Sequence, residues 1–287
     1  MSFRQDIIDK IKRHQDLPPL PDIVNKLSSM VSDGEASAED ISKVVQFDPG
    51  LAGRILRVAN SAAFGGASRV GSIPQAVMRI GFKRLKDIVL SLAFVQTFRN
   101  KAIDINFIRF WRHSLSVAFA CQEMEQLSQH IPKPSDEAFS TGLLHDLGVL
   151  VLGLYAPTPY RQVVAYAHTE NKDLCQAEEL ILGIDHAEAG AMLLKMWSLP
   201  ELVVEGAQHH HDPYPKDRTT GMLTKVVHLA NFACNNQGID NGMGTFPSTF
   251  SSGAWYDVGL KVEDIPSIIE EVNRRTTEAD EIIAAAQ

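Results

Sequence analysis

Apolar residues recur at helical spacing along almost the whole chain, and this pattern constrains the fold more than any other feature. Ile23, Val24, Leu27, Met30 and Val31, for example, fall on one face of a helix. No segment sustains the alternation of apolar and polar residues that is typical of a half-buried strand. The sequence therefore predicts an all-α protein.

Segments that disfavour helices divide this pattern. The stretch 99–106 is polar and has weak periodicity. We place a boundary there, with residues 1–100 as an N-terminal helical bundle and residues 101–287 as a second bundle with a C-terminal loop and helix. Residues 238–253 contain four glycines and many Ser, Thr and Asn residues, so we expect a long, irregular and mobile loop there.

Charge, apolar length and cysteine usage exclude several classes of protein. The chain has 27 Lys and Arg against 35 Asp and Glu, a net charge of −8, which argues against a broad nucleic-acid-binding or membrane-binding surface. Its longest apolar run, Leu147–Ala156, is too short to cross a bilayer, and the charged N-terminus is no secretory signal. Cys121, Cys175 and Cys234 are far apart, which fits a reduced interior and excludes a cysteine-based zinc site. We expect a cytoplasmic protein in which Cys121 and Cys234 pack in the core.

Polar residues interrupt five separate apolar helical faces. These residues are His113, His145, His186, His210 and Asn231. We predict that His145 and Asp146 lie in one continuous helix, STGLLHDLGVLVLGL (140–154). One buried histidine is usually a core residue bonded to a carbonyl, but unpaired polar burial costs a few kcal/mol per group, so five such positions should converge on one another, on water or on a metal. Imidazoles together with the Asp146 carboxylate suit Zn, Mn, Fe or Ni. We therefore predict either a divalent transition metal or no cofactor.

Six of the ten histidines are not in this set, and one of them, His211, directly follows His210. His14, His130 and His168 are expected on the surface or in loops. His209 and His228 are neighbours of the set whose role the sequence leaves open.

The polar positions lie in long motifs that resemble a known superfamily. After His113 come GLLHDLG (142–148), DHAEAGAMLLKMWSLP (185–200) and HHDP (210–213). This order resembles the HD superfamily of metal-dependent phosphohydrolases. The segments LPPLPDIVNKL (17–27), FDPGLAGRILRVANSAAFG (47–65) and SIPQAVMRIGFKRLKDIVL (72–90) are similar to the HDOD domain, a bacterial signalling relative of the HD and HD-GYP domains. The resemblance covers about residues 15–235.

The resemblance implies an HDOD fold of two packed helical bundles, the second HD-like, with a regulatory and often catalytically degenerate role. It implies these metal ligands: His113, His145, Asp146, His186, His210 and His211. The superfamily's final ligand is an Asp in a helix reading VVHLAD, and this chain has VVHLAN with Asn231 there. A neutral amide oxygen offsets less cation charge than a carboxylate. The segment after His211 also lacks the GxGYP signature of cyclic-di-GMP phosphodiesterases.

Three functions follow, in decreasing order of support. The first is a regulatory signal-transduction protein that acts through protein–protein contacts and keeps a degenerate HD metal site; homo-oligomers are compatible with it. The alternative is a metal-dependent phosphohydrolase or phosphodiesterase acting on nucleotides or cyclic nucleotides, with Asp146 as the catalytic residue. The third is a nucleic-acid-binding regulator, which rests only on a basic helical stripe formed by Arg79, Lys83 and Lys86. No aromatic residue interleaves this stripe, so base stacking is not indicated.

Overall fold

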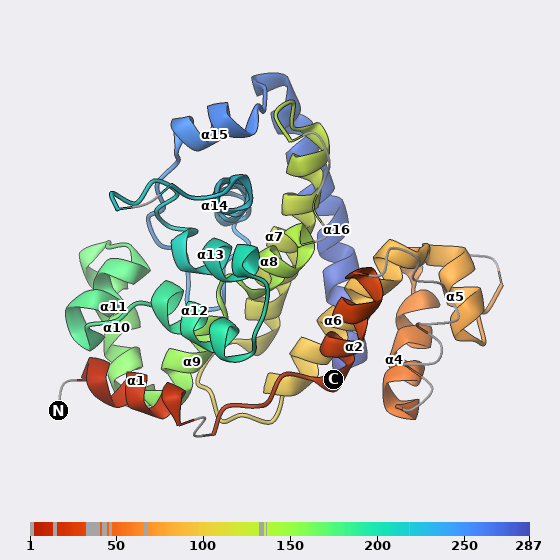
Figure 1. Cartoon of the computed structure of the whole chain (residues 1–287), viewed down its shortest axis with the longest axis horizontal. Helices are drawn as coiled ribbons and strands as arrows, with labels where there is room; N and C mark the ends of the chain where they lie inside the picture. Colours follow the sequence, from red (N-terminus) through yellow and green to blue (C-terminus); the bar gives the residue numbers. More distant parts are fainter. Residues whose placement is uncertain are drawn as a thin grey trace. The chain divides into compact units, whose positions relative to one another are not determined.

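The computed structural model describes residues 3–13, 16–32, 41, 45, 48–65, 68–131, 135, 137–217 and 219–287. All regular structure within these residues is helical, which confirms the all-α prediction (Figure 1). The chain divides into two compact units, one formed by Met1–Leu17 and Lys101–Arg275 and the other by Pro18–Asn100 and Thr276–Gln287.

The first unit holds most of the helices. They are α1 (Phe3–Lys12), α7 (Phe107–Leu127), α8 (Ala138–Leu144), α9 (Leu147–Tyr155), α10 (Pro157–Glu170), α11 (Leu174–Leu182), α12 (His186–Met196), α13 (Glu201–His209), α14 (Met222–Asn236), α15 (Ser252–Val258), the 3-10 turn η2 (Val262–Asp264) and the first part of α16 (Ile265–Ala286). Helix α7 packs against α8 and α14, α13 packs against α8 and α14, and α9 packs against α12. Cys121 and Cys234 are fully buried in the apolar core formed by α7, α14 and their neighbours, as expected.

Local sequence explains where these helices begin and how closely they approach. The Asn106 side chain accepts a hydrogen bond from the Arg109 amide at the start of α7, and Asp185 does the same for the Glu188 amide at the start of α12. Helix α9 approaches the backbone of α12 closely at Gly148. A Cβ added to Gly148 would lie 1.8 Å from the His186 carbonyl oxygen. The absence of a side chain at residue 148 therefore sets the spacing of two helices that carry site residues.

The second unit contains α2 (Asp22–Ser32), α4 (Pro49–Ala59), the 3-10 turn η1 (Ala62–Phe64), α5 (Ile73–Ile80), α6 (Phe82–Phe98) and the end of α16. The prediction of one basic stripe formed by Arg79, Lys83 and Lys86 is wrong. Arg79 lies in α5, whereas Lys83 and Lys86 lie in α6, because Gly81 adopts φ 87° and ends α5. Lys86 is also buried. The three side chains therefore do not share one helical face.

The two units join in the chain at residues 100 and 101, and each unit also includes a segment from one end of the sequence. Helix α1 belongs to the first unit, where Ile7 and Ile11 are buried and Arg4 pairs with Glu188 at 2.7 Å. Residues 276–287 belong to the second unit, where Glu278 pairs with Arg84. Apolar periodicity places residues on a helix face but does not show which bundle that face joins.

Among the described residues, one segment has the length and hydropathy to cross a membrane, Ala138–Tyr155. It is 89% buried inside the protein and is broken between α8 and α9 by His145 and Asp146. This segment is part of the core of the first unit.

Candidate metal centre

Four histidines surround the carboxylate of Asp146. Its Oδ1 lies 3.3 Å from Nε2 of His145, 3.3 Å from Nε2 of His210 and 3.4 Å from Nε2 of His186. Its Oδ2 lies 3.6 Å from Nε2 of His113. All five side chains are buried. The structure thus brings together residues that are up to 97 positions apart, since 210 − 113 = 97.

Each residue reaches the centre from a helix or a helix end. His113 lies within α7, His186 begins α12, and His210–His211 directly follow α13. His145–Asp146 form a break between α8 and α9, where we predicted one continuous helix; Asp146 has φ −97° and ψ 8°. Consecutive helical side chains point about 100° apart. The break therefore allows two adjacent side chains to reach the same centre.

The hydrogen bonds of the outer ring nitrogens fix the tautomer of three histidines. Nδ1 bonds a backbone carbonyl in each: Ile239 for His113 (2.6 Å), Gly142 for His145 (2.7 Å) and Ala207 for His210 (2.7 Å). A carbonyl oxygen only accepts, so Nδ1 carries the proton and Nε2 of the neutral ring presents a lone pair to the centre. This is the arrangement that orients metal-binding histidines.

The atoms that face the centre lack hydrogen bonds. Nε2 of His113, His145 and His210 and Oδ1 of Asp146 are buried without a hydrogen-bond partner among the described residues. Buried lone pairs that face one another without a proton between them are unfavourable. A cation at this point would satisfy all four atoms, so the residues present fit a metal ion.

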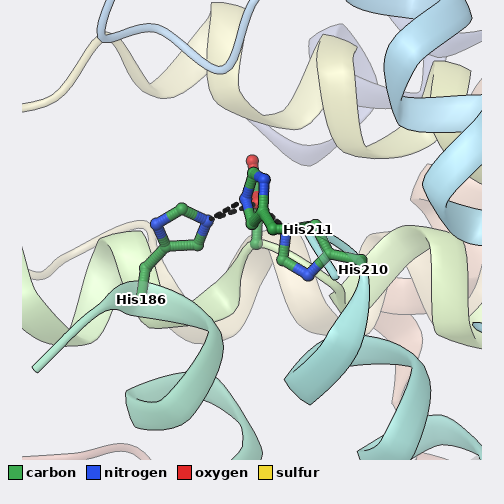
Figure 2. Close-up of side chains that lie close together, drawn as sticks. His186, His210 and His211 are labelled. Atoms are coloured by element: carbon green, nitrogen blue, oxygen red, sulfur yellow. Dashed lines mark hydrogen bonds and ion pairs between the residues drawn. The ribbon is translucent and has the colours of Figure 1, made fainter. Parts of the chain in front are cut away.

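His186 and His211 complete the set on one side of Asp146. His186 Nδ1 donates to Glu178 Oε2 at 2.7 Å, and its Nε2 lies 2.9 Å from Nε2 of His211. Figure 2 shows the His186 and His211 side chains close together with His210. Atoms that bind one ion at about 2.1 Å lie about 3 Å apart when they are adjacent ligands. The spacing of these two nitrogens therefore also fits a shared metal.

The ligand atoms form two groups that share Asp146. His113, His145 and Asp146 make one, and Asp146, His186, His210 and His211 make the other, with atoms within 4.8 Å of one another in each. Asn231 lines the same small pocket as Asp146 and His186, but its Oδ1 accepts a hydrogen bond from Asn235 at 2.8 Å. Six of the residues singled out from the sequence lie in these two groups. Asn231 lies in the adjoining pocket, and its oxygen is engaged by a neighbour.

Sequence reasoning missed two side chains beside the centre. Asn241 donates from Nδ2 to Asp146 Oδ2 at 3.0 Å, and Glu178 orients His186. Glu178 could have been found, because Leu174, Glu178 and Leu182 share one face of α11 and Glu178 is fully buried there. Asn241 lies in an irregular loop, where no periodicity marks an inward side chain.

The loop that we expected to be mobile is tied to the centre. Besides Asn241 and the Ile239 carbonyl, Asp240 pairs with Arg109 of α7. The Met243 carbonyl bonds His168 Nε2 at 3.0 Å. His168 is exposed, as predicted, and also anchors this loop. Residues 238–243 therefore form a fixed part of the site.

The remaining predicted neighbours take supporting places. His228 is buried and bonds the His210 carbonyl through Nδ1 at 2.8 Å. His130 lies at the surface and bonds the Asp257 carbonyl, and His14 lies outside the described residues.

Cys175 also lies beside the centre, with its Sγ 3.7 Å from His186 Nδ1. Burial raises the pKa of this thiol, so it stays protonated and is a poor metal ligand.

Burial and neighbouring charges shift the pKa values of the ionisable groups in the centre in opposite directions. Burial lowers the pKa of His145 to about 3, although Asp146 opposes the shift, and burial also lowers the pKa of His211 well below its usual value. Burial alone would raise the pKa of Asp146, but the surrounding imidazoles hold it well below its usual value. Burial would lower the pKa of His186, but the carboxylates of Glu178 and Asp146 raise it well above the ordinary range.

These shifts predict that the metal-free protein is most stable near pH 6.5. Folded His145 stays neutral down to about pH 3, whereas in the unfolded chain it binds a proton below about pH 6.5. Its contribution to stability is therefore lost as the pH falls, by about 1 kcal/mol between pH 6.5 and pH 5.5. The stability contributed by His186, whose folded pKa is raised, is complete below pH 6.5 and is lost as the pH rises.

The check is urea unfolding in EDTA at pH 5.5, 6.5 and 7.5. A free energy of unfolding that is higher at pH 5.5 than at pH 6.5 would contradict the burial of neutral imidazoles.

Comparison with known proteins places this geometry in a family. The fold is similar to an HDOD domain protein of unknown function from Geobacter sulfurreducens (TM-score 0.81, 23% identity, 99% of this chain and 98% of that chain). It is also similar to a protein described as a candidate signal transduction protein from Marinobacter aquaeolei VT8 (TM-score 0.80, 22% identity, 99% of this chain and 65% of that chain). A third similar structure is described as a candidate phosphohydrolase from Shewanella amazonensis SB2B (TM-score 0.72, 24% identity, 98% of this chain and 98% of that chain).

A sequence relative and a family model complete the comparison. An uncharacterized protein of Treponema pallidum is 24% identical over 216 residues, which are 75% of this chain; the chain spans 42% of that relative's length. The model of the HDOD domain matches residues 17–213, more than half of the 287 residues. The chain belongs to the HDOD domain family.

Proposed function

We propose that this chain is a regulatory, cytoplasmic signal-transduction protein that acts through contacts with other signalling proteins. In this proposal its HD-type centre binds a divalent transition metal and turns over no substrate. Membership of the HDOD family supports the regulatory role, and the space over the centre supports the absence of turnover.

The pocket over the centre is the observation that carries the proposal. It has a volume of about 30 Å³, and its lining includes Asp146, His186 and Asn231 together with the loop residues Asn241 and Phe246. A cavity measured in this way needs about 10–15 Å³ to hold one water molecule, whereas pockets for small molecules measure about 300 Å³ or more. The centre therefore has room for an ion or a water but not for a phosphoester.

The charges around the pocket agree with this. No Lys or Arg is among the described residues that line it, so the lining offers no permanently charged cationic side chain for a phosphoryl group. Asp146 is the one carboxylate in the two ligand groups that share it, and Asn231 adds no charge. A ligand set of imidazoles with one carboxylate suits one divalent ion better than two.

The residues that would hold the ion are His113, His145, Asp146, His186, His210 and His211. A divalent ion here could supply Lewis acidity to a bound water. In our proposal these residues instead use it to join the ends of α9, α12 and α13 to the middle of α7, so that the centre stabilises the first unit.

A metal-dependent phosphohydrolase is the second candidate. It is favoured by the two ligand groups that share Asp146, since a bridging carboxylate is the usual feature of two-metal hydrolytic sites. In this case Asp146 is the catalytic residue and the loop 238–253 must open to admit a nucleotide or another phosphoester.

Metal analysis and turnover assays on purified protein separate the two functions. We expect about one equivalent of Zn, Mn, Fe or Ni, and no hydrolysis of p-nitrophenyl phosphate or its bis-ester with added Mn²⁺ above the level of Asp146→Asn. Metal-dependent turnover that Asp146→Asn abolishes would establish the hydrolase instead. The regulatory role also requires a protein partner, so a protein that migrates alone in native extract, without cross-linked species, would contradict it.

A further inference from the structure

The second unit contains an open pocket of about 1010 Å³ that the metal centre does not use. One wall is a single face of α4. It is made by Gly53 and by Leu56 and Arg57, three and four residues further along, together with Asn60, which caps the end of the helix. The segment 68–71 and Arg79 of α5 form the rest, together with Glu281 of α16.

Asn60 and Arg79 hold the frame of the pocket in place. Asn60 Nδ2 donates to the Leu56 carbonyl at 2.7 Å and to the Val70 carbonyl at 2.8 Å, and its Oδ1 accepts from the Val70 amide at 2.7 Å. Arg79 donates to the Ala59 carbonyl at 3.0 Å and to the Ser68 carbonyl. The end of α4 and the segment before α5 are therefore fixed to each other around the cavity.

Three other polar side chains in the pocket make no hydrogen bond to the described part of the protein. The guanidinium groups of Arg57 and Arg69 make no hydrogen bond or ion pair with any described residue. The Ser61 hydroxyl is buried, lines the same pocket and has no hydrogen-bond partner among the described residues. A buried hydroxyl without a partner costs about 1–3 kcal/mol, so this group points to a ligand that accepts from it.

Gly53 lies on the same wall, and the packing of the protein does not explain it. A Cβ at this position would meet nothing within 4 Å, unlike one at Gly148. Glycine inside a helix is about 0.5–1 kcal/mol less favourable than alanine. A bare backbone here is useful where another molecule approaches α4 closely.

We propose that this pocket binds a phosphorylated small molecule of nucleotide size through Arg57, Arg69 and Ser61. Three arginines and one glutamate line it, a balance of 3 − 1 = +2. The planar fork of a guanidinium matches phosphate oxygens in a bidentate way. The volume suits a small ligand, and Leu56 and Val70 add an apolar surface for its non-phosphate part.

A nucleic acid fits these features less well. No aromatic side chain is among the described residues that line the pocket, so it offers no stacking platform. The chain as a whole carries a net charge of −8, which repels a polyanion.

The test is calorimetric titration of the EDTA-treated full chain with inorganic pyrophosphate and with ATP. EDTA removes metal-dependent binding at the HD-type centre, so the result is independent of the function proposed above. We expect both probes to bind with Kd below about 1 mM. The double variant Arg57→Gln/Arg69→Gln should weaken binding at least about tenfold, because it removes the unpaired charged donors.

Two further variants make the result specific. Arg54→Gln removes a charge from the same helix, but Arg54 lines a different cavity, so it should leave binding unchanged. Gly53→Leu should block the pocket as strongly as the double variant while the thermal midpoint stays near the wild-type value, and it decides the matter if the double variant does not fold. The proposal is overturned if neither probe binds, if Arg54→Gln weakens binding as much as the double variant, or if a DNA duplex binds more tightly than both probes.

Discussion

Asp146→Asn is expected to remove most of the stability that the protein gains from a divalent metal. The carboxylate of Asp146 contacts Nε2 of His113, His145, His186 and His210 at 3.3–3.6 Å. It is the one charged ligand shared by both metal-binding groups. An amide of the same shape keeps the volume and can still bond Asn241, but it cannot offset the charge of the ion.

The size of this effect follows from mass action. At a metal concentration about 1,000 times the wild-type Kd, the wild-type protein gains about 4 kcal/mol of unfolding free energy. If the substitution weakens binding by about 100-fold, a loss of the size known for changes at metal sites, the gain falls to about 1.4 kcal/mol. Urea unfolding with and without Mn²⁺ or Zn²⁺ measures both gains. Equal gains in the two proteins would show that the metal binds elsewhere.

Asn231→Asp is the matched control and should act in the opposite direction. It places a carboxylate at the position where the resembling HD motif has an Asp, in the pocket that Asp146 and His186 also line. We expect tighter metal binding than in the wild type. In the metal-free protein the same change should lower stability, because it adds a buried carboxylate near Asp146. Weaker metal binding in Asn231→Asp would show that this position does not face the ion.

The helical part of the centre could be predicted because a helix face can be read from one-dimensional spacing. His113 and His186 were predicted because each interrupts an apolar face, and the structure buries both. Glu178, which the prediction missed, is buried on such a face as well. The same criterion cannot identify Asn241 or the Ile239 carbonyl, which reach the centre from an irregular loop. A backbone carbonyl has no sequence signature, and loop side chains have no fixed period.

Chain breaks account for the two helical predictions that failed. From periodicity alone we predicted one continuous helix through His145 and another through Gly81. In the structure each is two helices, α8 and α9 in the first case and α5 and α6 in the second. At Gly81 the positive φ of 87° marks the end of α5, and a glycine there was the available signal. At His145 the following Asp146 leaves the helical region, and the local sequence carries no helix breaker before Gly148. Tertiary contacts of these two side chains prevail over local propensity there.

The second large prediction concerns the effect on stability of adding a Cβ to a glycine in α9, Gly148, compared with one in α4, Gly53. A Cβ at Gly148 would lie 1.8 Å from the His186 carbonyl oxygen and 2.7 Å from the Gly190 amide nitrogen. Both are backbone atoms, so no side chain can move aside, and α12 itself must shift. Any shift of α12 moves His186, which begins that helix.

Gly148→Ala should therefore destabilise the metal-free protein by about 3 kcal/mol or more and weaken metal binding at the same time. Gly53→Ala is the control: it adds the same methyl group inside a helix where nothing lies within 4 Å, so it should stabilise the protein by about 0.5–1 kcal/mol. Urea unfolding in EDTA and metal titration measure both effects. If the two substitutions change stability equally, the close crossing of α9 and α12 does not set the position of His186.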